Sequence, residues 1–195
     1  MNLVLALTGA TGAYAAEVLM KKSPWPVALV ASDWGKEVYR HECGAFEKLA
    51  AMAKQVYENA DLAAPISSGT VPTRGMVILP CSVNSLARIA GGMGDSLISR
   101  AAHCHLKERR KLILCVRESP WTRIDLENAA KVDSAGGIIM PLSPPFYAGA
   151  GKKTGEMTVA KLLEVYADHV LAMLGHPAPS EAWGGRVGKT TSRDG

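Results

Sequence analysis

The sequence predicts a single-domain α/β protein built on a doubly wound, mostly parallel sheet, a three-layer sandwich of the flavodoxin or Rossmann type. Two observations support this prediction. Five short runs are almost continuously apolar, which is typical of parallel strands covered on both faces. Helical segments separate these runs, and such alternation favours right-handed crossover connections. The 195 residues of the chain are enough for one such core.

The apolar runs and the helical periodicity give the order of elements. The expected strands are residues 3–7, 27–32, 75–80, 111–116 and 137–142. The expected helices are residues 12–22, 34–58, 83–91, 95–108, 123–134 and 158–174. Residues 1–175 should form the folded domain, whereas the Gly- and Ser-rich tail 176–195 is either flexible or packed on a neighbouring subunit.

Composition excludes several classes of protein. The net charge is +4, and basic residues are mixed with acidic ones along the chain, which argues against a nucleic-acid binder. No apolar run approaches the ~20 residues that span a bilayer, so we expect no membrane segment. The four cysteines show no CxxC spacing, and the first residues lack the features of an export signal. These features together predict reduced thiols in a cytoplasmic protein.

Ligands of such folds bind beyond the carboxyl ends of the strands. After the first strand comes TGATG, in which Gly9 permits a tight turn and Thr11 opens a helix. The amides of that helix start, with the Thr11 hydroxyl, can hold an anion. The motif is not a full GxGxxG, so a mononucleotide phosphate fits better than a dinucleotide. A turn needed only for packing remains the alternative.

Polar residues also follow the third and fourth predicted strands. Ser82, Asn84 and Ser85 can cap the next helix or bind a ligand, whereas Cys81 at a buried strand end is expected to be inert. In LKERRKLILCVRESPWTR an apolar strand ends on the pair Arg117 and Glu118. A charged pair at a carboxyl edge belongs to a pocket rather than to the core.

A histidine pair on the fifth predicted helix does not point to a metal. The side chains of His103 and His105 would lie about 200° apart around the helix, which makes a shared metal ion improbable. We expect both to face solvent or an interface. No other metal-ligand cluster is visible in the sequence.

These motifs resemble one family over roughly residues 3–147, and more weakly to Gly175. A glycine turn after the first strand, ISSGT before GMVILPCS, the segment RAAHCHLKERRKLILCVRESP and a final PPFY are similar to the flavin prenyltransferases, the UbiX-type flavoproteins. The resemblance implies transfer of a dimethylallyl group from dimethylallyl phosphate to N5 and C6 of reduced FMN, without a metal. The prenylated FMN would serve a partner decarboxylase. The family also implies a homo-oligomer, a dodecamer assembled from trimers, with active sites at subunit interfaces.

The resemblance assigns roles position by position. The FMN contacts are Gly9, Ala10, Thr11, Ser32, Ser82, Val83, Asn84, Ser85 and Arg117. The residues placed at the prenyl phosphate are Arg100, Lys107, Tyr147 and His169. Glu118 would be the acid–base residue, with Arg117 and Tyr147 beside it in the catalytic group. Breaking an allylic C–O bond releases a phosphate dianion, which explains the need for fixed cations. Arg100 and Lys107 are two helical turns apart and share one face.

Three positions depart from the family pattern and leave alternatives open. Thr11 replaces a serine, Asn84 replaces a lysine, and His169 stands where the family has a phosphate-binding arginine. Lys152 or Lys153 could supply that cation instead. Asn84 favours a flavin-dependent cysteine decarboxylase of the same fold, and His169 favours a non-catalytic carrier of prenylated FMN.

Three tryptophans suit contacts between subunits. Trp25, Trp34 and Trp121 are expected to be exposed, although any one of them could belong to the core.

Overall fold

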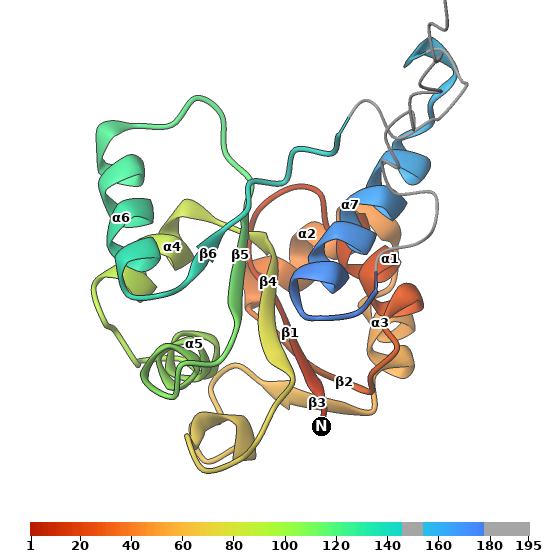
Figure 1. Cartoon of the computed structure of the whole chain (residues 1–195). Coiled ribbons are helices and arrows are strands. Elements are labelled where there is room, and N and C mark those ends of the chain that lie inside the picture. Colours follow the sequence, from red (N-terminus) through yellow and green to blue (C-terminus); the bar gives the residue numbers. More distant parts are fainter. Residues whose placement is uncertain (146–153, 178–195) are drawn as a thin grey trace, which may run out of the picture.

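The computed structural model describes residues 1–145 and 154–177, and it contains the predicted doubly wound sheet (Figure 1). All the strands are parallel, in the order β3-β2-β1-β4-β5-β6. Their bounds are β1 Leu3–Leu7, β2 Val27–Ala31, β3 Gln55–Glu58, β4 Gly75–Cys81, β5 Leu112–Val116 and β6 Ile138–Ile139. Strand order reverses between β1 and β4, so the topological switch point lies beside the central strand.

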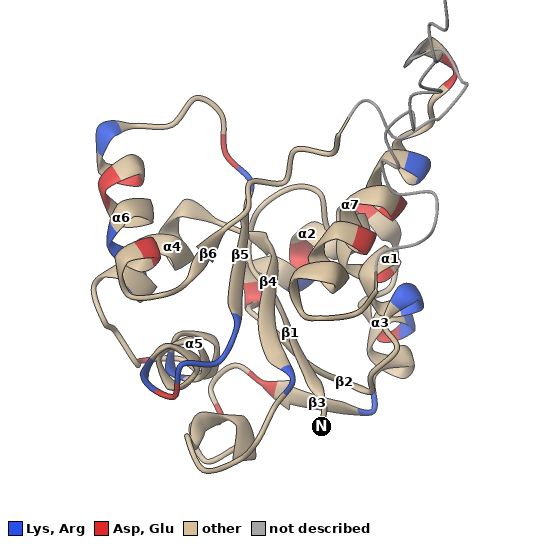
Figure 2. Cartoon of the chain, viewed as in Figure 1, with Lys and Arg blue, Asp and Glu red and all other residues tan. Residues whose placement is uncertain are grey.

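Two layers of helices bury both faces of the sheet. Leu3, Leu5 and Leu7 of β1 pack into one apolar cluster, while Val4 and Ala6 pack into the other. The first cluster lies under α1 Tyr14–Lys22, α2 Asp33–Cys43, α3 Phe46–Met52 and α7 Val159–Met173. The second lies under α4 Val83–Ala90, α5 Leu97–Lys107 and α6 Arg123–Ser134. Strands β1, β2, β4 and β5 carry no charged residue, which explains their continuous apolar runs (Figure 2).

The single helix predicted over residues 34–58 is wrong. Helix α2 ends at Cys43. The next residue, Gly44, caps the helix: its φ of +92° suits glycine, and its amide donates to the Arg40 carbonyl. Helix α3 follows, and residues 55–58 then form β3, which pairs with β2 at the edge of the sheet. Because β3 is largely exposed, it lacks the apolar run by which the other strands were predicted.

Two smaller expectations also fail. Of the strand expected at 137–142, only Ile138–Ile139 is a regular strand, β6, although the Met140 and Leu142 amides still donate to the Leu114 and Val116 carbonyls of β5 at 3.0 and 2.8 Å. His105, expected at solvent or an interface, is buried, whereas His103 is exposed. The His105 Nδ1–H donates to the Ala101 carbonyl at 2.7 Å, so Nε2 accepts from the Thr73 hydroxyl at 2.7 Å. His105 is therefore a hydrogen-bonded core residue.

The tryptophans differ in exposure. Trp34 is exposed, as expected, but Trp25 and Trp121 are partly buried. The Arg74 guanidinium lies 4.7 Å from the Trp25 ring centre, and the Trp121 indole donates to the Glu118 carbonyl at 3.0 Å. In the described ranges, no helix combines the length and the apolar character that crossing a bilayer requires.

Candidate functional site

A cavity of about 780 Å³ opens at the carboxyl edge of the sheet. Its walls come from the segments that follow β1, β2, β4 and β5 and from the start of α5. The cavity therefore lies beside the switch point between β1 and β4, where doubly wound sheets bind their ligands. Its volume is in the range of small-molecule and cofactor sites.

Thr8 joins the two central loops of this cavity. Its buried hydroxyl donates to the Pro80 carbonyl at 3.0 Å and accepts from the Ser82 amide at 2.8 Å. The ends of β1 and β4 are thus held in fixed register by one side chain. Sequence reasoning missed Thr8, because a hydroxyl at a strand end gives no sign of a partner 74 positions away.

Three helices begin at the cavity with capped N-termini: α2, α4 and α5, the last through a capping box of Ser96 and Ser99. The Ser32 hydroxyl accepts from the Gly35 amide at 3.0 Å and caps α2. The Ser82 hydroxyl accepts from the Ser85 amide at 3.2 Å and caps α4, as the sequence predicts. Helix N-termini carry partial positive charge and unsatisfied amide donors. The cavity wall is therefore suited to an anionic group such as a phosphate.

The turn after β1 contributes less to anion binding than the sequence suggests. Glu42, on α2, accepts from the Gly12 amide at 2.9 Å and from the Ala13 amide at 2.7 Å. This carboxylate caps α1, which has no side-chain cap of its own. The expectation that these helix-start amides hold a ligand anion is thus wrong for Gly12 and Ala13. Gly9, Ala10 and Thr11 still line the cavity.

Arg117 and Glu118 stand at the end of β5 and line the same cavity. The Arg117 amide donates to the Cys81 carbonyl at 2.9 Å, which extends the pairing of β5 with β4 by one residue. One Glu118 carboxylate oxygen accepts from the Ser119 amide at 3.0 Å. All nine residues predicted to contact FMN line the cavity, and Glu118 joins them.

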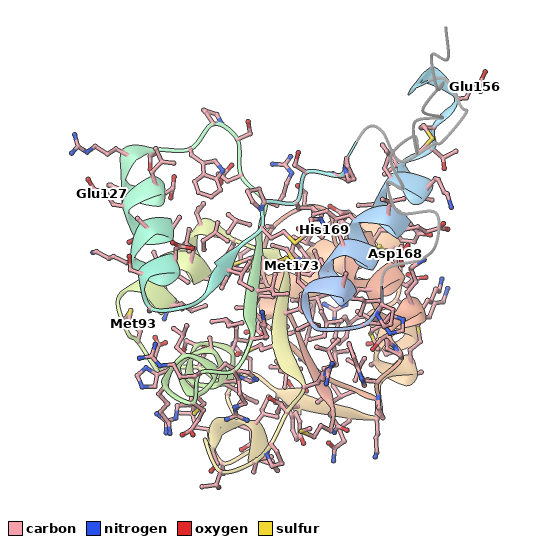
Figure 3. The ribbon with its side chains drawn as sticks, in the orientation of Figure 1. Met93, Glu127, Glu156, Asp168, His169 and Met173 are labelled. Atoms are coloured by element: carbon pink, nitrogen blue, oxygen red, sulfur yellow. The ribbon has the colours of Figure 1, made fainter. Side chains whose placement is uncertain are left out.

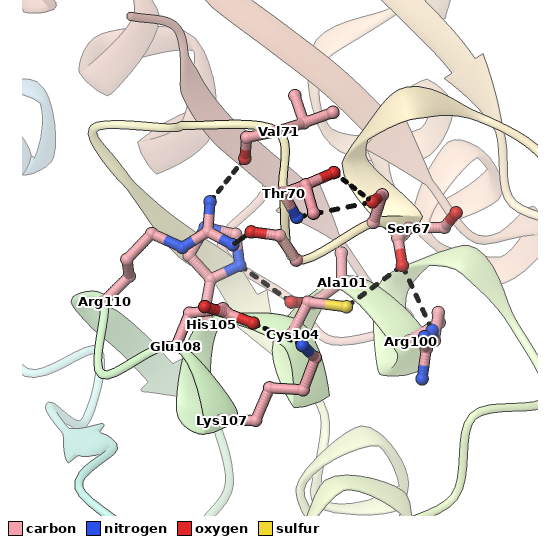
Figure 4. A network of polar contacts seen from close by, with 12 residues as sticks. Ser67, Thr70, Val71, Arg100, Ala101, Cys104, His105, Lys107, Glu108 and Arg110 are labelled. Atoms are coloured by element: carbon pink, nitrogen blue, oxygen red, sulfur yellow. Dashed lines mark hydrogen bonds and ion pairs between the residues drawn. The ribbon is translucent and has the colours of Figure 1, made fainter.

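Arg100 and Lys107 do not line this cavity. They lie along one side of α5, against the segment 67–69 (Figure 4). The Arg100 Nε–H donates to the Ser67 carbonyl at 3.1 Å, and Lys107 forms an ion pair with Glu108 beside Gly69. The two cations thus share a face, as their spacing predicts, but that face is separate from the cavity of their own chain.

The remaining predicted phosphate residues come from the C-terminal part of the chain. Tyr147, Lys152 and Lys153 lie outside the described residues. His169 is on α7 (Figure 3) and lines a second, smaller cavity of about 320 Å³. The neighbours of His169 there are Met140, Pro141, Ser143, Pro145 and Tyr166. The Tyr166 hydroxyl donates to the Met140 carbonyl at 2.7 Å, which fixes this segment on α7.

Several cavity residues had no signal in the sequence motifs. They are Asn59, Arg88, Ile89, Asp95, Ser96, Ile98 and Ser99; Asp33 and Trp34, which follow the second predicted strand, also line the cavity although neither was predicted to contact FMN. Asn59 follows β3, and its side-chain oxygen accepts from the Ile98 amide at 3.1 Å, so it holds the start of α5. Because residues 55–58 were predicted to be helical, the sequence did not indicate that Asn59 follows a strand and lies at the ligand-binding edge of the sheet. Arg88 and Asp95 form an ion pair across the loop that joins α4 to α5, which the spacing alone does not reveal.

The buried thiols and imidazole are not reactive groups. Burial raises the pKa of the Cys81 thiol well above its usual range and that of Cys115 to about 12, so both stay protonated. Burial, together with the nearby Arg110 charge, lowers the pKa of His105 to about 4, although its hydrogen bond to the Ala101 carbonyl acts in the opposite direction. Among the described residues, no group of three or more His, Cys, Asp or Glu side chains could hold a metal ion.

Comparison with known proteins decides the family. The family model described as Flavoprotein matches residues 1–167. The flavin prenyltransferase UbiX of Deinococcus radiodurans is 41% identical over 182 residues, which cover 91% of this chain and 90% of the relative. The chain belongs to the UbiX-type flavoproteins.

Two solved structures of this family share the fold. AnUbiX (PadA1), in complex with FMN and dimethylallyl pyrophosphate, aligns with a TM-score of 0.84 at 35% identity. That alignment covers 91% of this chain and 93% of AnUbiX. The dodecameric FMN-dependent UbiX-like decarboxylase of Escherichia coli O157:H7 aligns with a TM-score of 0.83 at 36% identity, covering 92% and 97% of the two chains. The flavodoxin-like sheet predicted from the sequence is confirmed.

Proposed function

We propose that this UbiX-type flavoprotein is a flavin prenyltransferase. It joins the dimethylallyl group of dimethylallyl phosphate to N5 and C6 of reduced FMN. The observation that carries the proposal is the cavity at the switch point, lined by all nine residues expected to bind FMN and by Glu118. AnUbiX, solved with FMN and a dimethylallyl donor, shares this fold over 91% of the chain.

The donors of the cavity fit a flavin mononucleotide. The capped starts of α2 and α4 offer amides and hydroxyls to a phosphate, and Arg117 adds a guanidinium. Glu42 already occupies two amides at the start of α1, the helix end to which Rossmann proteins bind a pyrophosphate. This arrangement supports a mononucleotide rather than a dinucleotide.

Glu118 is the acid–base residue of this proposal. Reduced FMN supplies the nucleophilic N5 and C6 positions. N5 would displace the phosphate and lose its proton. Ring closure would then add a proton to the dimethylallyl double bond, join the resulting cationic carbon to C6 and release the C6 proton. The Glu118 carboxylate lines the cavity and can accept that proton. Arg117 lies next to it, where a guanidinium can stabilise negative charge on the departing phosphate.

The complete site requires a second subunit. Arg100 and Lys107 do not line the cavity of their own chain, yet a prenyl phosphate needs fixed cations near the flavin. A homo-oligomer, as in the dodecameric Escherichia coli neighbour, would bring this face of α5 to the cavity of the next subunit. Tyr147 and His169 would complete the phosphate site.

The product would pass to a partner enzyme. Prenylated FMN is expected to be the cofactor of a decarboxylase, which makes such an enzyme the acceptor. All four cysteines are unpaired thiols, and we propose a cytoplasmic location on that ground.

Anaerobic incubation of the protein with reduced FMN and dimethylallyl phosphate tests the function. We expect mass spectrometry to show a flavin that has gained one five-carbon unit. A flavin that binds but stays unmodified would reject the transferase in favour of the carrier. Loss of carbon dioxide from a cysteine-terminated peptide, with unmodified flavin, would instead support the cysteine decarboxylase that Asn84 favours.

A further inference from the structure

Trp34 is an exposed aromatic side chain inside the candidate flavin cavity. Its relative exposure is 74%, and it lies on the first turn of α2. Of the large hydrophobic side chains exposed in the described ranges, Trp34 alone lines the cavity. It is also the one aromatic residue among the described cavity residues. An indole left in water at a ligand cavity gains free energy when a ligand covers it.

The backbone around Trp34 is held in place by two hydrogen bonds and by one close approach between backbones. The Ser32 amide donates to the Leu7 carbonyl at 3.0 Å, which ties the start of α2 to the end of β1. A Cβ at Gly35 would lie 2.6 Å from the Leu7 carbonyl oxygen, so only glycine lets the helix approach so closely. The capping bond from Gly35 to the Ser32 hydroxyl then sets the first turn of α2.

Gly9 makes room for the Trp34 side chain. A Cβ added at Gly9 would lie 2.6 Å from the Cβ of Trp34 and 3.5 Å from its Cγ. Glycine at position 9 therefore allows the tryptophan to stand directly against the turn after β1. Gly9 and Trp34 form one continuous piece of the cavity wall.

The indole has no partner of its own among the described residues. No hydrogen bond, ring contact or cation–π contact there involves the Trp34 side chain, although its backbone is firmly held. Trp25 and Trp121, by contrast, each contact a neighbouring group. The fold thus presents one flat, apolar and unpaired surface to the cavity at a fixed position.

We propose that Trp34 packs its indole against the bound flavin and sets the affinity of the site for FMN. This inference rests on the proposed function, because it requires FMN in this cavity. The phosphate has its donors at the starts of α2 and α4, whereas the isoalloxazine ring needs an apolar surface. The other apolar lining residues, Ala10, Val83, Ile89 and Ile98, are aliphatic. Only Trp34 offers an aromatic plane for stacking.

Affinity measurements on three variants test the role. Trp34→Ala should weaken FMN binding about tenfold, since the flavin ring loses the aromatic side chain on which it stacks. Trp34→Phe should weaken it less, about two- to threefold, because part of the aromatic surface remains. Ile124→Ala is the matched control, since Ile124 is 68% exposed on α6 and lies outside the cavity. It should leave the affinity unchanged.

Flavin fluorescence gives a second readout that a merely structural role would not change. An indole in contact with the isoalloxazine quenches its emission by electron transfer, so FMN bound to the wild type should be dim. The emission should recover in Trp34→Ala and stay quenched in Ile124→Ala. Light scattering on the same samples reports the assembled mass.

The outcomes separate this proposal from the proposed function. If the wild type binds no FMN, both ideas are overturned. If it binds FMN and Trp34→Ala binds it equally well with the same quenching, only the role of Trp34 is overturned. A loss of affinity that accompanies a change in assembled mass would also overturn it, and would make Trp34 a contact between subunits.

Discussion

The Thr8 hydroxyl accepts a hydrogen bond from the Ser82 amide at 2.8 Å and so links the carboxyl ends of β1 and β4 across the topological switch point. The same hydroxyl donates to the Pro80 carbonyl at 3.0 Å. The two loops that should hold the flavin therefore share one buried side chain. Their relative position depends on a pair of hydrogen bonds rather than on apolar packing alone.

Replacing Thr8 by valine tests this link. The change keeps the shape of the side chain but leaves the partly buried Ser82 amide without its acceptor, which costs roughly 1–3 kcal/mol. We expect urea denaturation at fixed protein concentration to show that loss, together with weaker FMN binding. Thr8→Ser keeps the hydroxyl and should retain most of the stability. Equal stability of the valine variant and the wild type would contradict the argument.

Glu118 should act in turnover and not in flavin binding. Glu118→Gln keeps the shape and the hydrogen bond from the Ser119 amide but cannot accept the proton released at C6. We expect unchanged FMN affinity and formation of the five-carbon adduct slowed at least about a hundredfold, within the range ascribed to general acid–base groups. Full activity in this variant would remove Glu118 from the mechanism.

The separation of Arg100 and Lys107 from the cavity predicts complementation between subunits. Lys107→Ala should bind FMN normally, because the residue does not line the flavin cavity, but should fail to turn over. Glu118→Gln lacks the acid–base residue of the cavity but keeps a normal Lys107. Mixed oligomers of the two variants should regain activity at sites that combine a normal cavity with a normal Lys107. A mixture as inactive as its parents would show that each site uses residues of a single chain.

Protonation of His105 should destabilise the protein in acid. Its pKa is lowered to about 4 from the ordinary value of 6.5, so the unfolded state binds more protons between these values. Stability is therefore complete above pH 6.5 and decreases as the pH falls toward 4, by about 3 kcal/mol at most. The main cause is burial, which makes a charge on the His105 ring unfavourable, and the positive charge of Arg110 adds repulsion.

Variants of the two histidines on α5 provide the measurement. His105→Asn should be less stable at pH 7.5 and should show a flatter stability profile between pH 7 and pH 5. His103→Gln, on the same helix but exposed, should follow the wild-type profile. An unaltered pH dependence in His105→Asn would contradict the assignment.

The positions proposed to contact the flavin could be placed at one cavity from the sequence, because they are local features of the chain. Ser32, Ser82 and Arg117 each follow a buried apolar strand directly, and parallel strands bring their carboxyl ends to one edge. The cavity is therefore lined by the residues that the strand pattern marks. The family resemblance gave each of these positions a role, which geometry alone did not.

Other parts of the site depend on contacts between distant segments. Glu42 reaches back 29 positions to cap α1, and Asn59 holds the start of α5 across 39 positions. Neither residue has a local pattern that names its partner. Strand β3 was not predicted for the same reason, namely that it depends on a distant segment. It is an exposed edge strand, stabilised by pairing with β2 and not by its own apolar content.

The sequence by itself determined the alternation of strands and helices, the parallel sheet and the edge at which ligands bind, since these follow from local hydrophobic periodicity. Only the tertiary structure decided that His105 is buried, that Arg100 and Lys107 do not line their own cavity, and that Trp34 lines it. Periodicity specifies which face of an element is apolar. Which polar or aromatic side chains meet at a site depends on how several such elements pack together.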